Sequence, residues 1–375
     1  MKETEIGYRG SKSGFLTELV KEQRVDGSFC MKHKPMQIRY TLMGFERNYQ
    51  LKYLSSQLGL YKKNYSTLKI YPNLNPYFVT GFLDAESTFN ISIQKDKEYK
   101  VGWQVRPKFS ISLHSRDLNL LMQLQEFFGG IGSLSKSKNR NSVSFGVSKL
   151  SDLINVIIPH FLFYPLLTQK AADFILFKRA LELMNKKEHL TIEGLSQIIN
   201  IRISMNWGIS EQQKMELIKS KFKLEVVDRP KILTENIPDP NWIAGFTSGE
   251  GNFYVNVSES NQLKVGHIVQ LKFSIAQHSK DLKLLEAIIK YLGAGIIEKK
   301  TNNSVVRLRI TKISDINNII IPLFEQCNIH GLKQFDYLDW FKVANLMSEG
   351  KHLTIEGLKE IRTIKSGMNK GRNLE

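Results

Sequence analysis

The sequence consists of two related halves. The stretch FSISLHSRDLNLL begins at Phe109 and returns as FSIAQHSKDLKLL at Phe273, an offset of 164 residues. HLTIEGL occurs letter for letter at His189 and at His352, an offset of 163 residues. Matches that keep their order at a nearly constant and long spacing indicate two tandem domains of one fold, and they exclude a solenoid of short repeats.

The repeat also predicts the domain boundaries. We expect domains at residues 73–207 and 237–375, with a polar, charged linker at 208–236 that has no counterpart in either copy. Residues 1–72 have no counterpart either, and we interpret them as a basic N-terminal extension. A chain of 375 residues with 42% hydrophobic content can bury cores of the size that this organisation requires.

The charge of the chain indicates its class of partner. The formal net charge is +17, and residues 1–72 hold 13 Lys and Arg against 6 Asp and Glu, so +10 belongs to the rest of the chain. Such a surplus attracts polyanions, with nucleic acid as the leading partner and a basic ribosome-associated or merely soluble protein as the alternative. No apolar run reaches the roughly 18 residues that a membrane-spanning helix needs. The sequence therefore indicates neither a membrane span nor a secretory signal. The cysteines Cys30 and Cys327 lie far apart, which indicates a reduced compartment without a disulfide framework or zinc site.

Each half begins with the same helix signal. Asn75 is followed by Pro76, and Asp239 by Pro240, which is the pattern of a helix N-cap with proline at the first helical position. Strands with alternating apolar and polar residues follow at 88–94 and 252–258. Each half therefore starts with a helix that leads into a strand.

The rest of each half continues in parallel. A second alternating strand, a helix that ends at glycine, two more strands and closing helices follow in both copies. The predicted fold class is α+β, with the order αββαββα in each half. Four antiparallel strands covered by helices on one face would leave the other face, which is polar and cationic, free to bind nucleic acid.

One short string recurs near the end of the first predicted helix of each half. It reads GFLDAESTF from Gly81 and GFTSGEGNF from Gly245. Gly81 and Ala85 are small residues four apart, and so are Gly245 and Gly249. Small residues at this spacing share one helix face and allow two helix backbones to approach closely. We therefore expect the two helices to pack on each other at a pseudo-twofold axis.

This packing would place Glu86 and Glu250 side by side at the two helix C-termini. A lone glutamate at a helix end is usually a solvated surface residue, but its recurrence in both copies favours a functional pair. Carboxylates there face the negative pole of the helix dipole and repel each other, which a divalent cation would offset. Carboxylate and carbonyl oxygens suit Mg²⁺, and metal-held oxygens around a phosphate suit phosphodiester hydrolysis.

The strings VTGFLDAES and IAGFTSGEG, each followed by an alternating strand, resemble the two LAGLIDADG motifs of single-chain homing endonucleases from organellar introns. YPLLTQKAADFILFK, NKKEHLT and HLTIEGL are also similar to that family, particularly to its fungal mitochondrial members, and the resemblance covers residues 73–371. It implies a monomer of two LAGLIDADG domains in the mitochondrial matrix, with saddle-shaped sheets in the DNA major groove. It also implies Mg²⁺-dependent cleavage of both strands, leaving short 3′ overhangs.

The resemblance assigns roles to individual positions. It implies metal ligands at Glu86, Glu250, Ala85 and Gly249, and catalytic roles for Glu86, Glu250, Lys170 and Lys333. The second copy departs from the pattern, because Thr247 and Ser248 stand where the first has Leu83 and Asp84. In the first copy, Ser87 stands where the motif usually ends in glycine, and a left-handed helix cap at Ser87 would cost roughly 1 kcal/mol relative to glycine.

DNA recognition is expected on the outward faces of the strands. Each half could cover about one helical turn, near 10 base pairs, so the target would be asymmetric and roughly 20 base pairs long. The candidate DNA-binding residues are Asn90, Ser92, Gln94, Arg106, Lys108, Lys136, Lys138, Arg140, Asn252, Tyr254, Asn256, Gln270, Lys272, Arg307 and Arg309. Of these, the run from Lys136 to Arg140 lies on a hairpin turn and is expected to contact phosphates.

Two other functions stay open on the sequence. The same fold serves in RNA maturases that help splice their group I intron, so the host intron RNA is a second possible partner. A sequence-specific DNA-binding protein without catalysis is the other alternative. Retention of both glutamates favours cleavage, which can coexist with maturase activity. The matched histidines have no zinc-ligand spacing and are expected to be structural or capping; they are His114, His278, His189 and His352.

Overall fold

The structure, a computed structural model, describes residues 74–137, 140–220, 222–299 and 304–372. The N-terminal extension and the candidate Lys138 lie outside these residues. In the first half the elements are α3 (Pro76–Glu86), β1 (Ser87–Lys95), β2 (Trp103–His114), α4 (Leu118–Phe127), β3 (Ser133–Lys136), β4 (Ser142–Val147), α5 (Leu150–Asp152), a π-helix η3 (Leu153–Ile157), α6 (Ile158–Phe163), α7 (Lys170–Asn185) and α8 (Ile192–Ser204). A linker helix, α9 (Glu211–Lys219), follows.

The second half repeats this order. Its elements are α10 (Pro240–Glu250), β5 (Gly251–Glu259), β6 (His267–His278), α11 (Leu282–Leu292), β7 (Ile296–Lys299), β8 (Val305–Ile310), α12 (Ile313–Asp315), a π-helix η6 (Ile316–Ile320), α13 (Ile321–Gln326), α14 (Lys333–Ser348) and α15 (Ile355–Ser366). Single 3-10 turns lie between these elements or after the last one, namely η2 (Ser115–Asp117), η4 (Glu188–Leu190), η5 (Ser279–Asp281), η7 (Lys351–Leu353) and η8 (Asn369–Gly371). The predicted order of helices and strands, αββαββα, is therefore confirmed in both halves. No helix among the described residues has both the length and the apolar character needed to cross a bilayer.

Each half contains one antiparallel sheet of four strands. The strand orders are β1-β2-β4-β3 and β5-β6-β8-β7, so the two hairpins of each half join through their second and fourth strands. The core lies on the face covered by helices. Phe89 of β1 is fully buried and its ring packs on Phe174 and Phe177 of α7. Phe253 of β5 packs in the same way on Tyr337 and Trp340 of α14.

The first helix of each half begins as its N-cap signal predicts. The Asn75 side chain accepts a hydrogen bond from the amide of Tyr77 at 2.8 Å, and that of Asp239 accepts one from Asn241 at 2.8 Å. His114 and His278 cap the 3-10 turns η2 (Ser115–Asp117) and η5 (Ser279–Asp281), since each ring accepts from the amide two residues later. The capping role expected for these two histidines is thus confirmed.

The C-terminal ends of four helices test the caps expected from the sequence. Gly293 caps α11 with a φ of 68°, as predicted, but Phe128 caps α4, and the two glycines follow it. The left-handed cap considered for Ser87 does not occur, because its φ is −87° and its ψ is 167°. The backbone of Gly251 is equally extended in the second copy. Glycine is required at this position because a Cβ would overlap Thr247.

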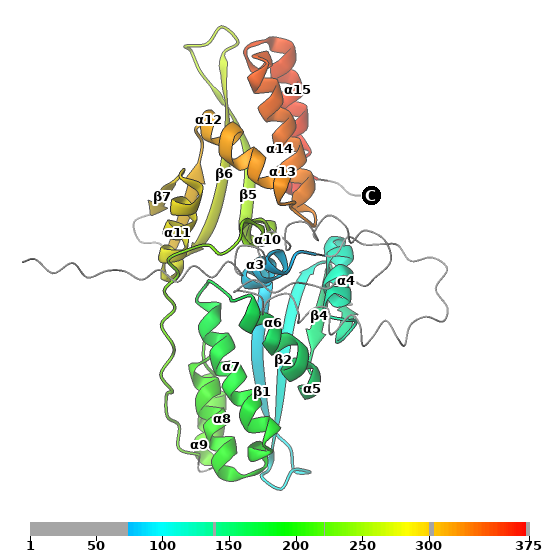
Figure 1. Ribbon diagram of the computed structural model, residues 1–375, viewed down its shortest axis with the longest axis vertical. Helices are drawn as coiled ribbons and strands as arrows, with labels where there is room; N and C mark the ends of the chain where they lie inside the picture. Colours follow the sequence, from blue (N-terminus) through cyan, green and yellow to red (C-terminus); the bar gives the residue numbers. More distant parts are fainter. Residues whose placement is uncertain (1–73, 138–139, 221, 300–303, 373–375) are drawn as a thin grey trace, which may run out of the picture. The chain divides into compact units, whose positions relative to one another are not determined.

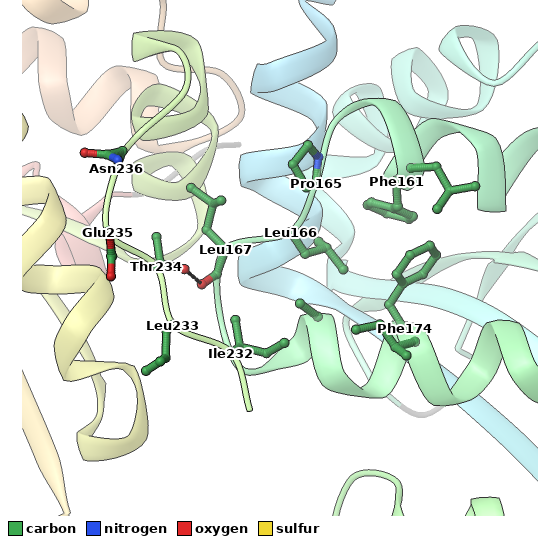
Figure 2. A pocket seen from close by; sticks show the side chains of 13 residues that line it. Phe161, Pro165, Leu166, Leu167, Phe174, Ile232, Leu233, Thr234, Glu235 and Asn236 are labelled. Atoms are coloured by element: carbon green, nitrogen blue, oxygen red, sulfur yellow. Dashed lines mark hydrogen bonds between the residues drawn. The ribbon is translucent and has the colours of Figure 1, made fainter. Parts of the chain in front are cut away.

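The linker is held against the first half. Its Arg229 guanidinium forms two hydrogen bonds to the Asp173 carboxylate, at 2.5 and 2.9 Å. Thr234 donates to the carbonyl of Leu167 at 2.6 Å, and the two residues lie at the edge of an apolar pocket formed by the linker and α6–α7 (Figure 2). The segment that enters α7 is therefore fixed by the linker as well as by its own domain.

Candidate active site

The two halves meet where α3 and α10 lie side by side (Figure 1). A Cβ on Gly81 would overlap the carbonyl oxygen of Trp242, and one on Gly245 would overlap the carbonyl oxygen of Phe78. Only glycine permits this backbone contact. The predicted close packing of the two motif helices is therefore present, with glycines at equivalent points of both.

Glu86 and Glu250 are the last residues of α3 and α10. Burial raises the pKa of the Glu86 carboxyl, and the nearby ammonium groups of Lys333 and Lys170 act in the opposite direction. Burial also raises the pKa of Glu250, and the negative charge of Glu86 raises it further. The two glutamates are thus close enough to interact, as expected from their place beside the helix contact.

Lys170 and Lys333 are the first residues of α7 and α14, and each reaches the C-terminus of a motif helix. Lys170 Nζ donates to the carbonyls of Leu83 at 3.1 Å and Ala85 at 3.2 Å. Lys333 Nζ donates to the carbonyls of Gly249 at 2.6 Å and Gly251 at 2.5 Å. Burial lowers the pKa of both lysines. Their ammonium groups balance the two carboxylates and the negative ends of the helix dipoles.

The oxygens at this centre fit a divalent metal of the Mg²⁺ type. The two carboxylates and the carbonyls of Ala85 and Gly249 form a set of oxygen donors only, which a hard cation prefers. A carbonyl oxygen has two lone pairs, so a hydrogen bond from a lysine leaves one for a cation. The described residues contain no cluster of three or more His, Cys, Asp or Glu for a metal. Water and substrate phosphate would complete the coordination, as is usual for Mg²⁺.

Asp84 is a residue of the motif whose role sequence reasoning missed. Its carboxyl accepts hydrogen bonds from the amides of Leu167, at 2.6 Å, and Thr168, at 3.2 Å, and from the Thr168 hydroxyl. Burial raises its pKa to about 6. In the second half Ser248 takes this place and accepts from the amide of His330 at 3.2 Å. The two copies therefore differ in the hydrogen bonds that hold the segments before α7 and α14.

Three further polar residues of the centre were also missed. Asp281 accepts from the amide of Gln169 at 2.7 Å, and Asp117 accepts from the amide of Leu332 at 2.8 Å. Gln277 forms a hydrogen bond to Glu250 that lowers the carboxyl pKa. The aspartates recur within HSRDL and HSKDL, so the repeat contains a signal for them.

A family model described as LAGLIDADG endonuclease matches residues 79–181 and, a second time, residues 243–344. The chain belongs to the LAGLIDADG endonuclease family. Each matched segment contains one of the two motif glutamates and one of the two lysines that contact the motif helices, so the family model covers this arrangement once in each half.

Individual LAGLIDADG proteins support the same conclusion. The chain is 44% identical over 380 residues to Probable intron-encoded endonuclease 3 of Neurospora crassa, covering 97% of this chain and 70% of that protein. Probable intron-encoded endonuclease 2 of the same fungus is 39% identical over 313 residues, covering 82% and 68%. The I-SmaMI LAGLIDADG homing endonuclease bound to cleaved DNA is 44% identical, with a TM-score of 0.76 over 80% of this chain and 98% of that one.

The outward faces of the LAGLIDADG sheets carry the DNA-binding candidates. Asn90 stands opposite Lys108, Ser92 opposite Arg106, and Tyr254 opposite Lys272. These residues are exposed or half-buried, and so are all other candidates within the described ranges, namely Gln94, Lys136, Arg140, Asn252, Asn256, Gln270, Arg307 and Arg309. Each sheet therefore presents a polar surface on the side away from the core.

Arg309 is distinguished, among the candidates that the structure describes, by an acidic partner. Its guanidinium lies 2.8 Å from the carboxylate of Glu298 on the neighbouring strand β7. Both side chains are about one-third exposed, at 33% and 35%. Arg309 would have to share its charge between this carboxylate and a DNA phosphate, which the sequence pattern alone did not indicate.

Proposed function

We propose that this LAGLIDADG protein is a site-specific homing endonuclease that cuts both strands of an asymmetric DNA target of about 20 base pairs. The observation that supports it most is the pairing of Glu86 and Glu250 at the contact between α3 and α10. One chain holds both acids, so a monomer would suffice to cut two strands. We expect the surroundings of the glutamates to differ and each glutamate to serve a different strand.

The residues of the centre have distinct roles in hydrolysis. Glu86, Glu250 and the carbonyls of Ala85 and Gly249 would hold Mg²⁺, which when bound polarises the phosphate and makes water a better nucleophile. Lys170 and Lys333 lie against the same helix ends and would stabilise negative charge that develops on the phosphate. Since burial lowers the pKa of both lysines, each loses its proton more readily than a free lysine, and the neutral amine could then act as a base.

The two sheets would supply specificity. A two-stranded ribbon fits the DNA major groove, where each base pair presents its own pattern of donors and acceptors. Equivalent positions of the two sheets carry different side chains, since Asn90 corresponds to Tyr254 and Arg106 to Gln270. An asymmetric target follows from this difference.

The relatives indicate where such an enzyme would act. The two Neurospora crassa proteins are named as intron-encoded endonucleases. We infer that this chain is likewise encoded in an intron of a fungal mitochondrial gene and acts in the matrix. Cleavage of the uninterrupted gene would then promote copying of the intron into it.

The test is cleavage of the host gene's uninterrupted exon junction. Purified protein with Mg²⁺ is expected to cut both strands of this duplex, to leave an intron-containing duplex intact and to stop when a chelator is added. Binding of the junction without any nicking would defeat the proposal. A binding assay with the host intron RNA tests whether the protein also binds this RNA, as a maturase would.

A further inference from the structure

Two aspartates outside the motifs connect the halves at the active site. Asp117 belongs to the first half, yet it accepts the amide of Leu332 in the second half at 2.8 Å. Asp281 belongs to the second half and accepts the amide of Gln169 in the first half at 2.7 Å. In both cases the bonded residue directly precedes the active-site lysine. Each half therefore binds the residue before the helix that begins with the other half's lysine; these two lysine helices are α7 and α14.

The two aspartates lie at equivalent places in the two halves. Asp117 ends η2 and is the N-cap residue of α4, and Asp281 occupies the same place before α11, but neither carboxylate accepts a capping hydrogen bond from its own helix. Asp117 is half-buried, and Asp281 is buried. A carboxylate at the N-terminus of a helix accepts a free amide and favours the positive end of the helix dipole. The hydrogen bonds can therefore fix where α7 and α14 begin.

The start of α14 also determines where the Lys333 ammonium lies. Leu332 is the N-cap residue of α14, Lys333 is the first helical residue, and its Nζ reaches two carbonyls at the end of α10. Gly331 has a φ of 71°, and a Cβ there would lie 2.8 Å from the Asp117 carboxylate. The glycine thus leaves room for the carboxylate to reach the Leu332 amide.

The two lysine helices differ in their other anchors. The segment before Lys170 is also held by the Asp84 carboxylate, through the Leu167 and Thr168 amides and the Thr168 hydroxyl. The segment before Lys333 has only the hydroxyl of Ser248 at that place, at 3.2 Å from the His330 amide. Loss of the cross-half hydrogen bond should therefore displace Lys333 more than Lys170.

We propose that Asp117 and Asp281 are positioning residues that hold the opposite half's lysine at the cleavage centre, and that Lys333 depends on Asp117 more than Lys170 depends on Asp281. This inference rests on the proposed function of the two lysines. Both halves would then contribute to each cleavage centre, because the lysine comes from one half and the aspartate that positions it comes from the other.

Strand-resolved cleavage tests the proposal. On a junction duplex with a different dye on each strand, Asp117→Ala should slow one strand by about tenfold or more, because small displacements of a catalytic group have large effects. Asp281→Ala should slow the other strand by a smaller factor. Asp117→Asn keeps an oxygen acceptor and should preserve most of the rate. The control Asp315→Ala removes a pair with Lys312, at 3.5 Å, and a hydrogen bond from the Ser314 hydroxyl, at 3.2 Å; neither partner belongs to α7 or α14, so the change should slow neither strand.

A second measurement does not need nuclease activity. Lysine accessibility is measured by labelling with limiting acetic anhydride and mass spectrometry. In Asp117→Ala, Lys333 should react several-fold faster than in the parent protein while Lys170 is unchanged. Unchanged labelling of Lys333, or equal slowing of both strands together with equal labelling of both lysines, would overturn the proposal. If the parent protein cleaves no DNA, the proposed function fails, and the labelling alone decides whether the aspartates position the lysines.

Discussion

Glycine at two positions determines how closely the halves can pack. Gly81 and Gly245 bring the backbones of α3 and α10 into direct contact, so any side chain there would meet main-chain oxygen. Backbone cannot move aside as a flexible side chain can. The placement of Glu86 and Glu250, only one turn or so further along each helix, therefore depends on these glycines.

Gly81→Ala is expected to destabilise the protein by about 3 kcal/mol, because the new Cβ would overlap the carbonyl oxygen of Trp242. Urea unfolding measures this loss. Gly367→Ala is the matched control, since its Cβ would find its nearest neighbour, the carbonyl of Ile364, at 3.6 Å. Equal stability of the two variants would contradict the packing described for α3 and α10.

The residues of the centre were predictable to different degrees. Glu86 and Glu250 stand out in sequence because they recur behind the same small residues. Lys170 and Lys333 followed from the family resemblance, since nothing in their local sequence indicates that they reach the end of a helix some 80 residues away. Asp117 joins an amide 215 residues later, and a contact of this length leaves no local pattern.

Helices and strands were predicted well because their signals are local. The N-cap pairs and the alternation of β1 and β5 depend on neighbours within a few residues, and the structure follows them. The structure of the linker was harder to predict, because a polar segment without a counterpart in the repeat gives no periodic signal. Its contacts with α7, through Arg229, and with the segment before α7, through Thr234, arise from tertiary structure.

The same type of ion pair occurs near the end of each half. Asp173 of α7 binds Arg229 and the amide of Asn206, and Asp336 of α14 binds Arg372 and the amide of Asn369. Arg229→Ala would leave the buried Asp173 carboxylate without its ion pair, and we expect a loss of about 2 kcal/mol in unfolding free energy. Lys214→Ala, which removes the exposed pair with Glu211, should change stability by about 0.5 kcal/mol or less. A similar effect of both changes in urea unfolding would mean that the linker is not anchored by this pair.

Across the whole molecule, one chain combines two polar sheets with two acids at a shared helix contact. The net charge of +17 favours a polyanion such as DNA, and the pseudo-symmetry gives each half its own glutamate and lysine. The copies are nevertheless inequivalent, because Asp84 and Ser248 hold the lysine helices differently. The protein is therefore one enzyme with two related but distinct halves.

The most direct measurement compares Glu86→Gln and Glu250→Gln with the parent protein on the uninterrupted junction duplex, with Mg²⁺ for cleavage and Ca²⁺ for binding. Glutamine keeps the size of the side chain but removes the charge that would hold the metal. We expect each change to abolish double-strand cleavage, while the dissociation constant for DNA stays within about threefold of the parent value. Full cleavage by either variant, or a large loss of DNA affinity, would contradict the catalytic role of the glutamate pair.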